Sequence, residues 1–113
     1  MNTALTYVIK FVANMDAAVQ FHVARLGLKL RFQSPEWSEF ETGPTTLALH
    51  KASAEHPAGS CELGLGVADI DRFFAVQTAQ GTQILSPPTD LHGRRIMKLR
   101  DADGAELSVS GTT

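Results

Sequence analysis

The amino-acid sequence predicts an α+β fold built from two tandem βαβββ modules. A strand-like segment leading into a capped helix occurs twice: Val12-Ala13-Asn14-Met15-Asp16 is matched by Val67-Ala68-Asp69-Ile70-Asp71 at an offset of 55 residues. Gly27 and Gly81, which are each expected to end a helix, lie 54 residues apart, and three strand-like segments follow each of them. Similarity at a nearly fixed period and in the same order indicates a duplicated unit.

The first module begins with a strand predicted over Leu5–Val12, where most residues are β-branched or aromatic. Asn14 is a typical N-cap and Asp16 suits the first turn of a helix, so a helix is predicted over Met15–Arg25. Apolar residues three or four positions apart predict its buried face: Met15, Val19, Val23 and Leu26. Gly27 is predicted to end the helix in the left-handed conformation.

Three short strands are predicted after this helix, because turns rich in Pro, Gly and Ser separate three β-prone segments. They cover Leu28–Gln33, Trp37–Glu41 and Thr45–His50. The segment 52–60 has no periodicity and contains Ser, His, Pro and Gly, so it is predicted to link the two modules.

The second module repeats this pattern. A strand is predicted over Glu62–Val67, followed by a helix from Ile70 to about Gln80 that Asp69 caps and Gly81 ends. The three remaining strands are predicted over Thr82–Leu85, Arg94–Arg100 and Ala105–Ser110. The turn Asp101-Ala102-Asp103-Gly104 is predicted to join the last two as a hairpin.

Residues 1–113 are therefore predicted to form one domain, with module one at about 4–51, a linker at 52–60 and module two at about 61–111. A ferredoxin-like βαββαβ fold would place two strands between its helices. Four strand-like segments separate the two predicted helices here, so the strand count favours two βαβββ modules.

The composition is that of an ordinary globular chain, with 43% hydrophobic and 19% charged residues. Ten basic against twelve acidic residues give a net charge of −2, which argues against a nucleic-acid binder. Cys61 is the only cysteine, which excludes an intrachain disulfide and a cysteine metal cage. No apolar run approaches the roughly 18 residues that a membrane span requires, so no membrane partner and a cytoplasmic location are expected.

Short motifs occur in a fixed order along the chain: Tyr7-Val8-Ile9, Met15-Asp16, Ala18-Val19-Gln20-Phe21, Leu26-Gly27-Leu28, Thr45-Thr46-Leu47-Ala48-Leu49, Pro87-Pro88, Gly93-Arg94-Arg95 and Asp101-Ala102-Asp103-Gly104. In this order they resemble the glyoxalase / bleomycin-resistance / extradiol dioxygenase (vicinal oxygen chelate) superfamily. The resemblance implies modules that form a cupped, open mixed β-sheet barrel with the helices outside. It also implies a ligand site inside the cup, and a homodimer.

Enzymes of this superfamily hold a divalent metal with one ligand from the first and last strand of each module. The resemblance carries these four positions onto Tyr7, Ala48, Glu62 and Ser108. Only Glu62 is a good ligand, whereas a catalytic Zn²⁺ needs about three protein ligands, so no metal is expected. An alternative register, shifted by two residues, would bring Glu62, His50 and Glu106 together for Zn, Ni, Mn or Fe.

Strand alternation then predicts which side chains line the cup. Placing Phe40, Leu63, Leu65 and Val67 under the helices sends the following residues inward: Tyr7, Ile9, Phe11, Trp37, Glu39, Ala48, His50, Glu62 and Ser108. Aromatic rings beside carboxylates favour a flat or cationic ligand. We therefore expect a metal-independent small-molecule binding protein, resembling the drug-sequestering members of the superfamily.

The other polar residues are expected to be packed, solvated or paired. His22 is expected to pack its helix against the sheet, while His56 and His92 are expected to be solvated loop residues. Glu62 is costly to bury unpaired, and therefore needs Tyr7, Arg94, Arg95 or a ligand as partner.

Whether the chain is an enzyme stays open at this point. A glyoxalase-like lyase, isomerase or dioxygenase could use a divalent metal, or proton transfer with Glu62 or His50 as base and Tyr7 as donor. A third alternative is a protein that mainly dimerises and has a filled cup.

Overall fold

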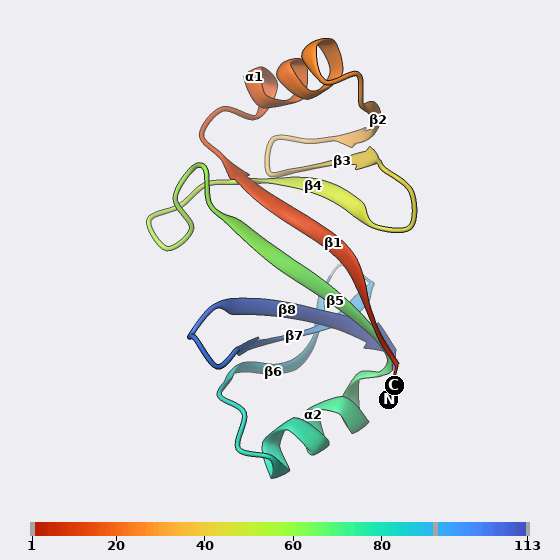
Figure 1. The fold of residues 1–113 in the computed structure, drawn as a ribbon, viewed down its shortest axis with the longest axis vertical. Helices are drawn as coiled ribbons and strands as arrows, with labels where there is room; N and C mark the ends of the chain where they lie inside the picture. Colours follow the sequence, from red (N-terminus) through yellow and green to blue (C-terminus); the bar gives the residue numbers. More distant parts are fainter. Residues whose placement is uncertain (1, 92, 113) are drawn as a thin grey trace. The chain divides into compact units, whose positions relative to one another are not determined.

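The computed structural model describes residues 2–91 and 93–112, and the chain divides into two compact units (Figure 1). One unit is Thr6–Glu62, and the other is Leu63–Thr113 with Met1–Leu5. Both follow the order strand, helix, three strands, so the predicted α+β class with two βαβββ modules is confirmed. His92 lies outside the described residues.

The first unit is a four-stranded mixed sheet with one helical segment. Its elements are β1 (Thr3–Val12, of which Thr3–Leu5 belong to the other unit), α1 (Met15–Gln20), the π-helical turn η1 (Phe21–Arg25), β2 (Lys29–Gln33), β3 (Trp37–Glu41) and β4 (Thr46–Lys51). The strand order is β2-β3-β4-β1, in which β1 runs parallel to β4 and the other pairs are antiparallel.

The predicted helix over Met15–Arg25 is one α-helical and one π-helical segment rather than a single α-helix. Asn14 caps it as predicted, since its side-chain oxygen accepts a hydrogen bond from the backbone N–H of Ala17 at 3.0 Å. The π turn closes with a hydrogen bond from Leu26 N to Phe21 O at 3.3 Å. Gly27 then ends the segment with φ of 71°, which confirms the predicted left-handed cap.

Two of the four residues predicted to form the buried face of this helix are exposed. Met15 and Val19 are buried, but Val23 and Leu26 are 41% and 53% exposed. The third buried position belongs to His22, which is 3% exposed and stacks on Phe40 of β3 with ring centroids 5.3 Å apart. The expected packing role of His22 is therefore confirmed.

His22 can be buried because both of its ring nitrogens have partners. Nδ1 lies 2.7 Å from the carbonyl oxygen of Ala18, and Nε2 lies 3.0 Å from Nζ of Lys10 on β1. A carbonyl oxygen only accepts and an ammonium group only donates, so Nδ1 carries the proton and the imidazole is neutral. A purely hydrophobic periodicity does not predict such a residue.

Side chains pack on both faces of the first sheet. The face under α1 carries a core of Met15, Val19, Phe40 and Leu49, while Ile9, Phe11 and Ala48 form a second cluster with Tyr7 and Trp37 packed against it. Because side chains alternate along a strand, Phe40 and Leu49 point one way, whereas Ala48 and Trp37 point the other.

Ser38 is a buried polar residue on the face of the sheet under α1. It is 0% exposed on β3, and its hydroxyl makes no hydrogen bond among the described residues. A buried hydroxyl without a partner costs about 1–3 kcal/mol. Ser38→Ala is therefore expected to leave the free energy of unfolding unchanged or to raise it by about 1 kcal/mol in urea denaturation.

Ser34 gives the matched control for this substitution, because its hydroxyl donates to Trp37 O at 2.7 Å. Ser34→Ala should lower the free energy of unfolding by about 1 kcal/mol. A loss in Ser38→Ala as large as that in Ser34→Ala would contradict the account of Ser38.

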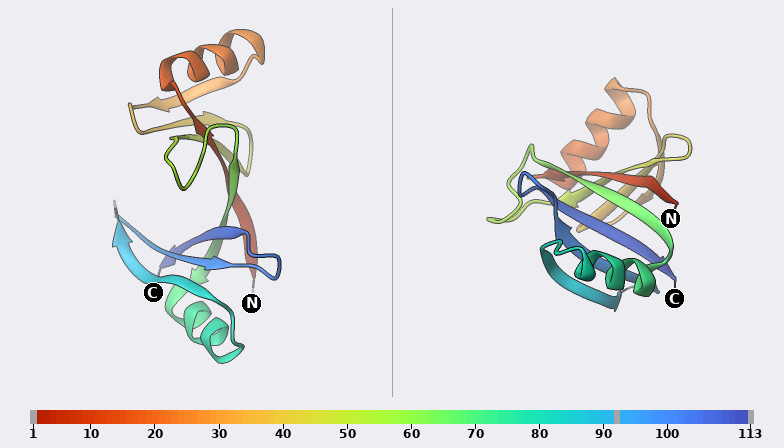
Figure 2. Two further views of the ribbon diagram at one scale, coloured as in Figure 1. Left: turned by 90° about the vertical axis from the view of Figure 1, so that its left-hand side faces the viewer. Right: turned by 60° about the horizontal axis from the view of Figure 1, so that its bottom comes forward.

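The second unit repeats the architecture. Its elements are β5 (Cys61–Asp69, of which Cys61 and Glu62 belong to the first unit), α2 (Ile70–Ala79), β6 (Ile84–Leu91), β7 (Arg94–Arg100) and β8 (Glu106–Thr112). The strand order is β5-β8-β7-β6, with β5 parallel to β8. The carboxylate of Asp69 accepts from Arg72 N at 3.0 Å, and Gly81 has φ of 82°, so both predicted ends of α2 are confirmed. The helix α2 covers one face of this sheet (Figure 2). The core of this unit consists of Val67, Ile70, Phe73, Met97, Leu99 and Val109.

Two predictions for this unit are wrong in detail. The strand predicted over Thr82–Leu85 is displaced to Ile84–Leu91 and runs through Pro87-Pro88, which lie beyond the predicted strand. Prolines are tolerated there because β6 is outermost in its unit, and its pairing with β7 shifts register around them. Leu63, predicted to pack under the helix, is 44% exposed at the start of β5.

Among the described residues, neither α1 nor α2 has the length and apolar character that crossing a membrane requires.

Candidate functional site

Five aromatic rings of the first unit form an unbroken chain of contacts. The ring centroids of Tyr7 and Trp37 lie 5.9 Å apart, and those of Trp37 and His50 are also 5.9 Å apart. His50 then contacts Phe11 at 5.4 Å, and Phe11 stacks on His56 at 4.5 Å with 13° between the planes. We call the surface made by Tyr7, Phe11, Trp37, His50 and His56 the aromatic face.

Strand register explains why three of these rings lie in a row. Trp37 on β3 pairs with His50 on β4, and His50 pairs with Phe11 on β1. Residues that are paired across a sheet project to the same side, so a single line across three strands carries three rings. Ile9 and Ala48, which pair on the next row, are 8% and 0% exposed and form the base of the face.

The side predicted for these residues agrees with the structure. Tyr7, Ile9 and Phe11 share one side of β1, and Trp37 and Ala48 join them from the neighbouring strands. Tyr7 and Trp37 are half-buried, while His50 is exposed and its Nδ1 donates to the carbonyl oxygen of Lys51 at 2.7 Å. Their role in binding a ligand stays a prediction.

His56 reaches the aromatic face through the segment predicted as a linker. The backbone of this segment pairs with the end of β1, because Gly59 N donates to Phe11 O and Phe11 N donates to Ser60 O, both at 2.9 Å. The expectation that His56 is a solvated loop histidine is therefore wrong, since its side chain is 27% exposed and stacked. Backbone pairing of a loop leaves no periodic pattern of side chains, so it could not be predicted from the sequence.

Glu62 is buried at the end of the aromatic face. It is 5% exposed, and its Oε1 lies 3.5 Å from Nε2 of His56. A buried carboxylate was expected to need a partner, and the structure supplies His56, which had not been among those predicted. Arg95, one of the expected partners, instead pairs with Asp71 at 3.0 Å and Asp90 at 3.2 Å.

Arg95 is therefore paired with two acidic side chains of the second unit. The hydrogen bond from its guanidinium to Asp71, and then that to Asp90, raises the pKa of Arg95 above its ordinary value. It stays charged at every physiological pH.

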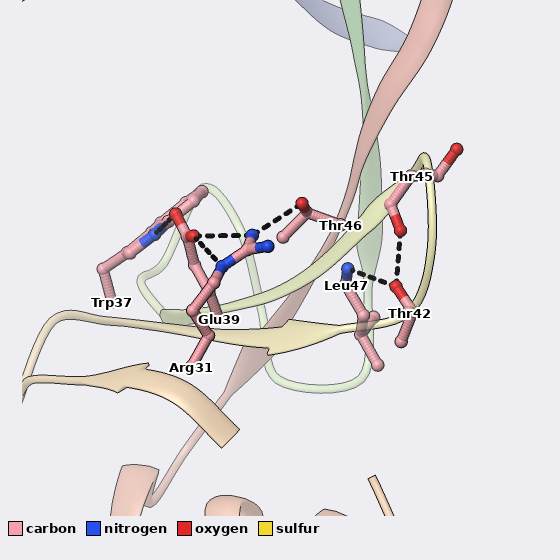
Figure 3. Close-up of polar contacts among 7 residues, drawn as sticks. All are labelled: Arg31, Trp37, Glu39, Thr42, Thr45, Thr46 and Leu47. Carbon is pink, nitrogen blue, oxygen red and sulfur yellow. Dashed lines mark hydrogen bonds and ion pairs between the residues drawn. The ribbon is translucent and has the colours of Figure 1, made fainter. Parts of the chain in front are cut away.

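Glu39 lies beside Trp37 but does not present an unpaired charge. Its Oε2 accepts from Trp37 Nε1 at 2.8 Å, and its Oε1 accepts from Arg31 Nη2 at 2.9 Å (Figure 3). Arg31 Nη2 also donates to Oγ1 of Thr46 at 2.7 Å. Arg31 was not predicted as a site residue, although the opposite charges of Arg31 and Glu39 on two predicted neighbouring strands were the available signal.

The remaining predicted residues lie in the second unit. Ser108 is half-buried on β8, where it pairs with Gly64 and Lys98. Glu106, which the alternative metal register would use, forms an ion pair with Lys98 at 3.0 Å.

The site offers two kinds of chemistry besides stacking. His56 and Glu62 form an imidazole–carboxylate pair that could transfer a proton. Imidazole and carboxylate are also ligand types for Zn, Ni, Mn or Fe, and a catalytic Zn²⁺ takes about three protein ligands. Of the four positions where superfamily enzymes carry ligands, Tyr7, Ala48 and Ser108 provide a phenol, a methyl and a hydroxymethyl group.

Comparison with solved structures finds the same fold in several proteins. A hypothetical protein from Bacillus halodurans C-125 is 17% identical with a TM-score of 0.83, over 100% of this chain and 96% of that one. A methylmalonyl-CoA epimerase from Streptomyces coelicolor in complex with 2-nitronate-propionyl-CoA is 19% identical with a TM-score of 0.79, over 100% and 96%. The methylmalonyl-CoA epimerase from Mycobacterium tuberculosis is 17% identical with a TM-score of 0.78, over 96% and 87%.

At identities of 17% and 19%, these structures show that the fold is shared and nothing more. A comparison with curated proteins finds no match. The family model of the Glyoxalase/Bleomycin resistance protein/Dioxygenase superfamily matches residues 4–109. Since this match spans nearly the whole chain, the protein belongs to the Glyoxalase/Bleomycin resistance protein/Dioxygenase superfamily.

Proposed function

We propose that this protein binds a flat aromatic small molecule against the aromatic face, without requiring a metal. The observation that carries the proposal is the unbroken contact of five rings, of which Tyr7, Trp37 and His56 are half-buried and His50 is exposed. Partly exposed rings held by a rigid sheet offer stacking area at little cost in conformational entropy.

Positive charge on such a ligand would be favoured at one end of the face. Ring faces attract cations, and the buried carboxylate of Glu62 lies beside His56 at that end. In keeping with the drug-binding members of the superfamily, we propose sequestration as the role of this binding.

Calorimetric titration of the purified protein with naphthalene derivatives tests the proposal. Saturable binding is expected, and Trp37→Leu should weaken it about tenfold because a stacking surface is lost. Phe21→Leu is the matched control, since Phe21 is 47% exposed on η1, away from the aromatic face. Absence of binding, or equal weakening in both variants, would contradict the proposal.

Proton transfer is the second candidate function, and the 3.5 Å pair of His56 and Glu62 favours it. Such a pair can remove a proton from the carbon beside a carbonyl group and return it. The two methylmalonyl-CoA epimerases named above share this fold. The test is solvent deuterium incorporation into a carbonyl compound, which should fall to background in Glu62→Gln if the pair is the base.

The metal-dependent alternative has its own measurement. Stoichiometric Zn, Ni, Mn or Fe in the purified protein would favour a lyase or dioxygenase, with His56 and Glu62 among the ligands. The titration above would then be repeated after treatment with a chelator, and undiminished binding of the ring compounds would keep the metal-independent proposal.

A homodimer is the remaining part of the proposal. All residues of β2 are exposed, including the large apolar side chains of Leu30 and Phe32, and Leu26 of the preceding turn is exposed as well. Apolar side chains beside an outermost strand suit contact with a second chain. Light scattering after size-exclusion chromatography should give about twice the mass of 12.2 kDa, and a monomer mass would remove this part.

A further inference from the structure

Arg31 on β2 lies on the same side of the first sheet as the aromatic face. Leu30 pairs with Phe40 and Phe32 pairs with Glu39, so Arg31 and Phe32 together face one residue of β3. This is the pattern of a β-bulge. Because Leu30 pairs with Phe40 on the α1 face, the next residue, Arg31, points to the opposite side. The guanidinium consequently lies on the same side of the sheet as Glu39, Trp37 and Thr46 (Figure 3).

The resulting hydrogen bonds run from Arg31 through Glu39 to the indole of Trp37, and we call this chain of hydrogen bonds the relay. Arg31 donates twice to one oxygen of Glu39, from Nη2 at 2.9 Å and Nε at 3.2 Å. The other oxygen of Glu39 accepts from the indole N–H of Trp37 at 2.8 Å. Thr46, which is 8% exposed, fixes Nη2 from the opposite side at 2.7 Å.

This relay has two physical consequences. It holds Trp37 in one orientation, because its N–H is bonded to a carboxylate that is itself clamped. It also cancels the charge of Glu39, whose side chain is 20% exposed, so a ligand at the Trp37 end does not meet an unpaired carboxylate.

We propose that Arg31 is the residue that sets charge specificity at the Trp37 end of the aromatic face. By neutralising Glu39 it makes this end accept uncharged rings, and it confines any preference for positive charge to the Glu62 end. This inference rests on the proposed function and adds to it the class of group accepted beside Trp37, namely an uncharged ring.

The experiment compares one naphthalene ring carrying an ammonium, a hydroxyl or a carboxylate group, titrated by calorimetry. In Arg31→Met, Glu39 keeps its charge without its partner, so binding of the ammonium compound should strengthen about fivefold relative to the hydroxyl compound. Binding of the carboxylate compound should weaken by a similar factor, about fivefold. Arg31→Lys retains the charge and should keep the wild-type order of the three compounds.

Two controls separate this effect from a general loss of structure. Lys29→Met removes a second ion pair between the same strands, that of Lys29 with Glu41 at 3.6 Å, and should leave selectivity unchanged. Adding Glu39→Gln to Arg31→Met removes the carboxylate as well, and should return selectivity to that of the wild type.

Fluorescence gives a readout that needs no ligand, because Trp37 is the only tryptophan of the chain. Released from the relay, the indole should show lower steady-state anisotropy and stronger acrylamide quenching in Arg31→Met, but not in Lys29→Met. Binding with unchanged selectivity in Arg31→Met overturns the inference alone. Absence of binding of any ring to any variant overturns the proposed function, and the inference falls with it.

Discussion

Gly111→Ala is expected to cause a large loss of stability. Gly111 on β8 pairs with Val67 on β5, and a β-carbon at Gly111 would overlap the carbonyl oxygen of Val67 and lie 3.2 Å from its Cγ2. The obstacle is a backbone atom in a paired strand, so it cannot rotate away as a side chain would. We expect a loss of about 3 kcal/mol or more, and a Tm lower by about 10 °C or more.

Circular dichroism during heating and in urea measures this effect. Gly43→Ala is the comparison, because Gly43 has φ of 98° but an added methyl meets nothing within 4 Å. It should show the cost of backbone strain alone, about 1 kcal/mol. Equal losses in the two variants would contradict the steric account of Gly111.

His22→Ala is expected to have the next largest effect. Truncation opens a cavity beside Phe40 and removes the hydrogen bonds to Ala18 O and Lys10 Nζ. A buried side chain lost together with two partnered polar groups should cost about 3 kcal/mol in the free energy of unfolding. Urea denaturation at neutral pH measures it.

His50→Ala is the matched control, because His50 is exposed and, besides its ring contacts with Phe11 and Trp37, its Nδ1 donates to the carbonyl oxygen of Lys51. Its cost should stay at about 1 kcal/mol, because an exposed side chain loses only part of its ring contacts and one hydrogen bond. His22→Phe should recover part of the packing but not the hydrogen bonds. A loss in His22→Ala no larger than that in His50→Ala would show that His22 does not support the helix.

Local chemistry explains why much of the fold could be predicted. Asn14 and Asp69 cap their helices through hydrogen bonds to residues three positions ahead, and Gly27 and Gly81 end them through their own φ. These features depend on a few neighbouring residues, so the sequence carries them directly. The duplicated order of the elements then followed from repeating the same local signals.

The parts that could not be predicted depend on tertiary contacts. The packing of His22 was expected, but its hydrogen-bond partner Lys10 comes from another element, and the path of β6 through two prolines requires an outermost strand. Alternation along the strands did place Tyr7, Phe11 and Trp37 on one side. It did not supply the hydrogen bonds of Arg31 to Glu39 and Thr46, which depend on the pairing of three strands. Nor could it place His56, because backbone pairing positions its loop.

The nuclear magnetic resonance signal of the Trp37 indole N–H tests the central claim most directly, since the chain contains a single tryptophan and its N–H is bonded to Glu39. Titration with the hydroxyl-bearing naphthalene should shift this one signal, and the shift should saturate with the Kd obtained by calorimetry. Signals of α2 should stay in place. Calorimetric binding that leaves the indole signal unmoved, or that moves the signals of α2 instead, would contradict a ligand site on the aromatic face.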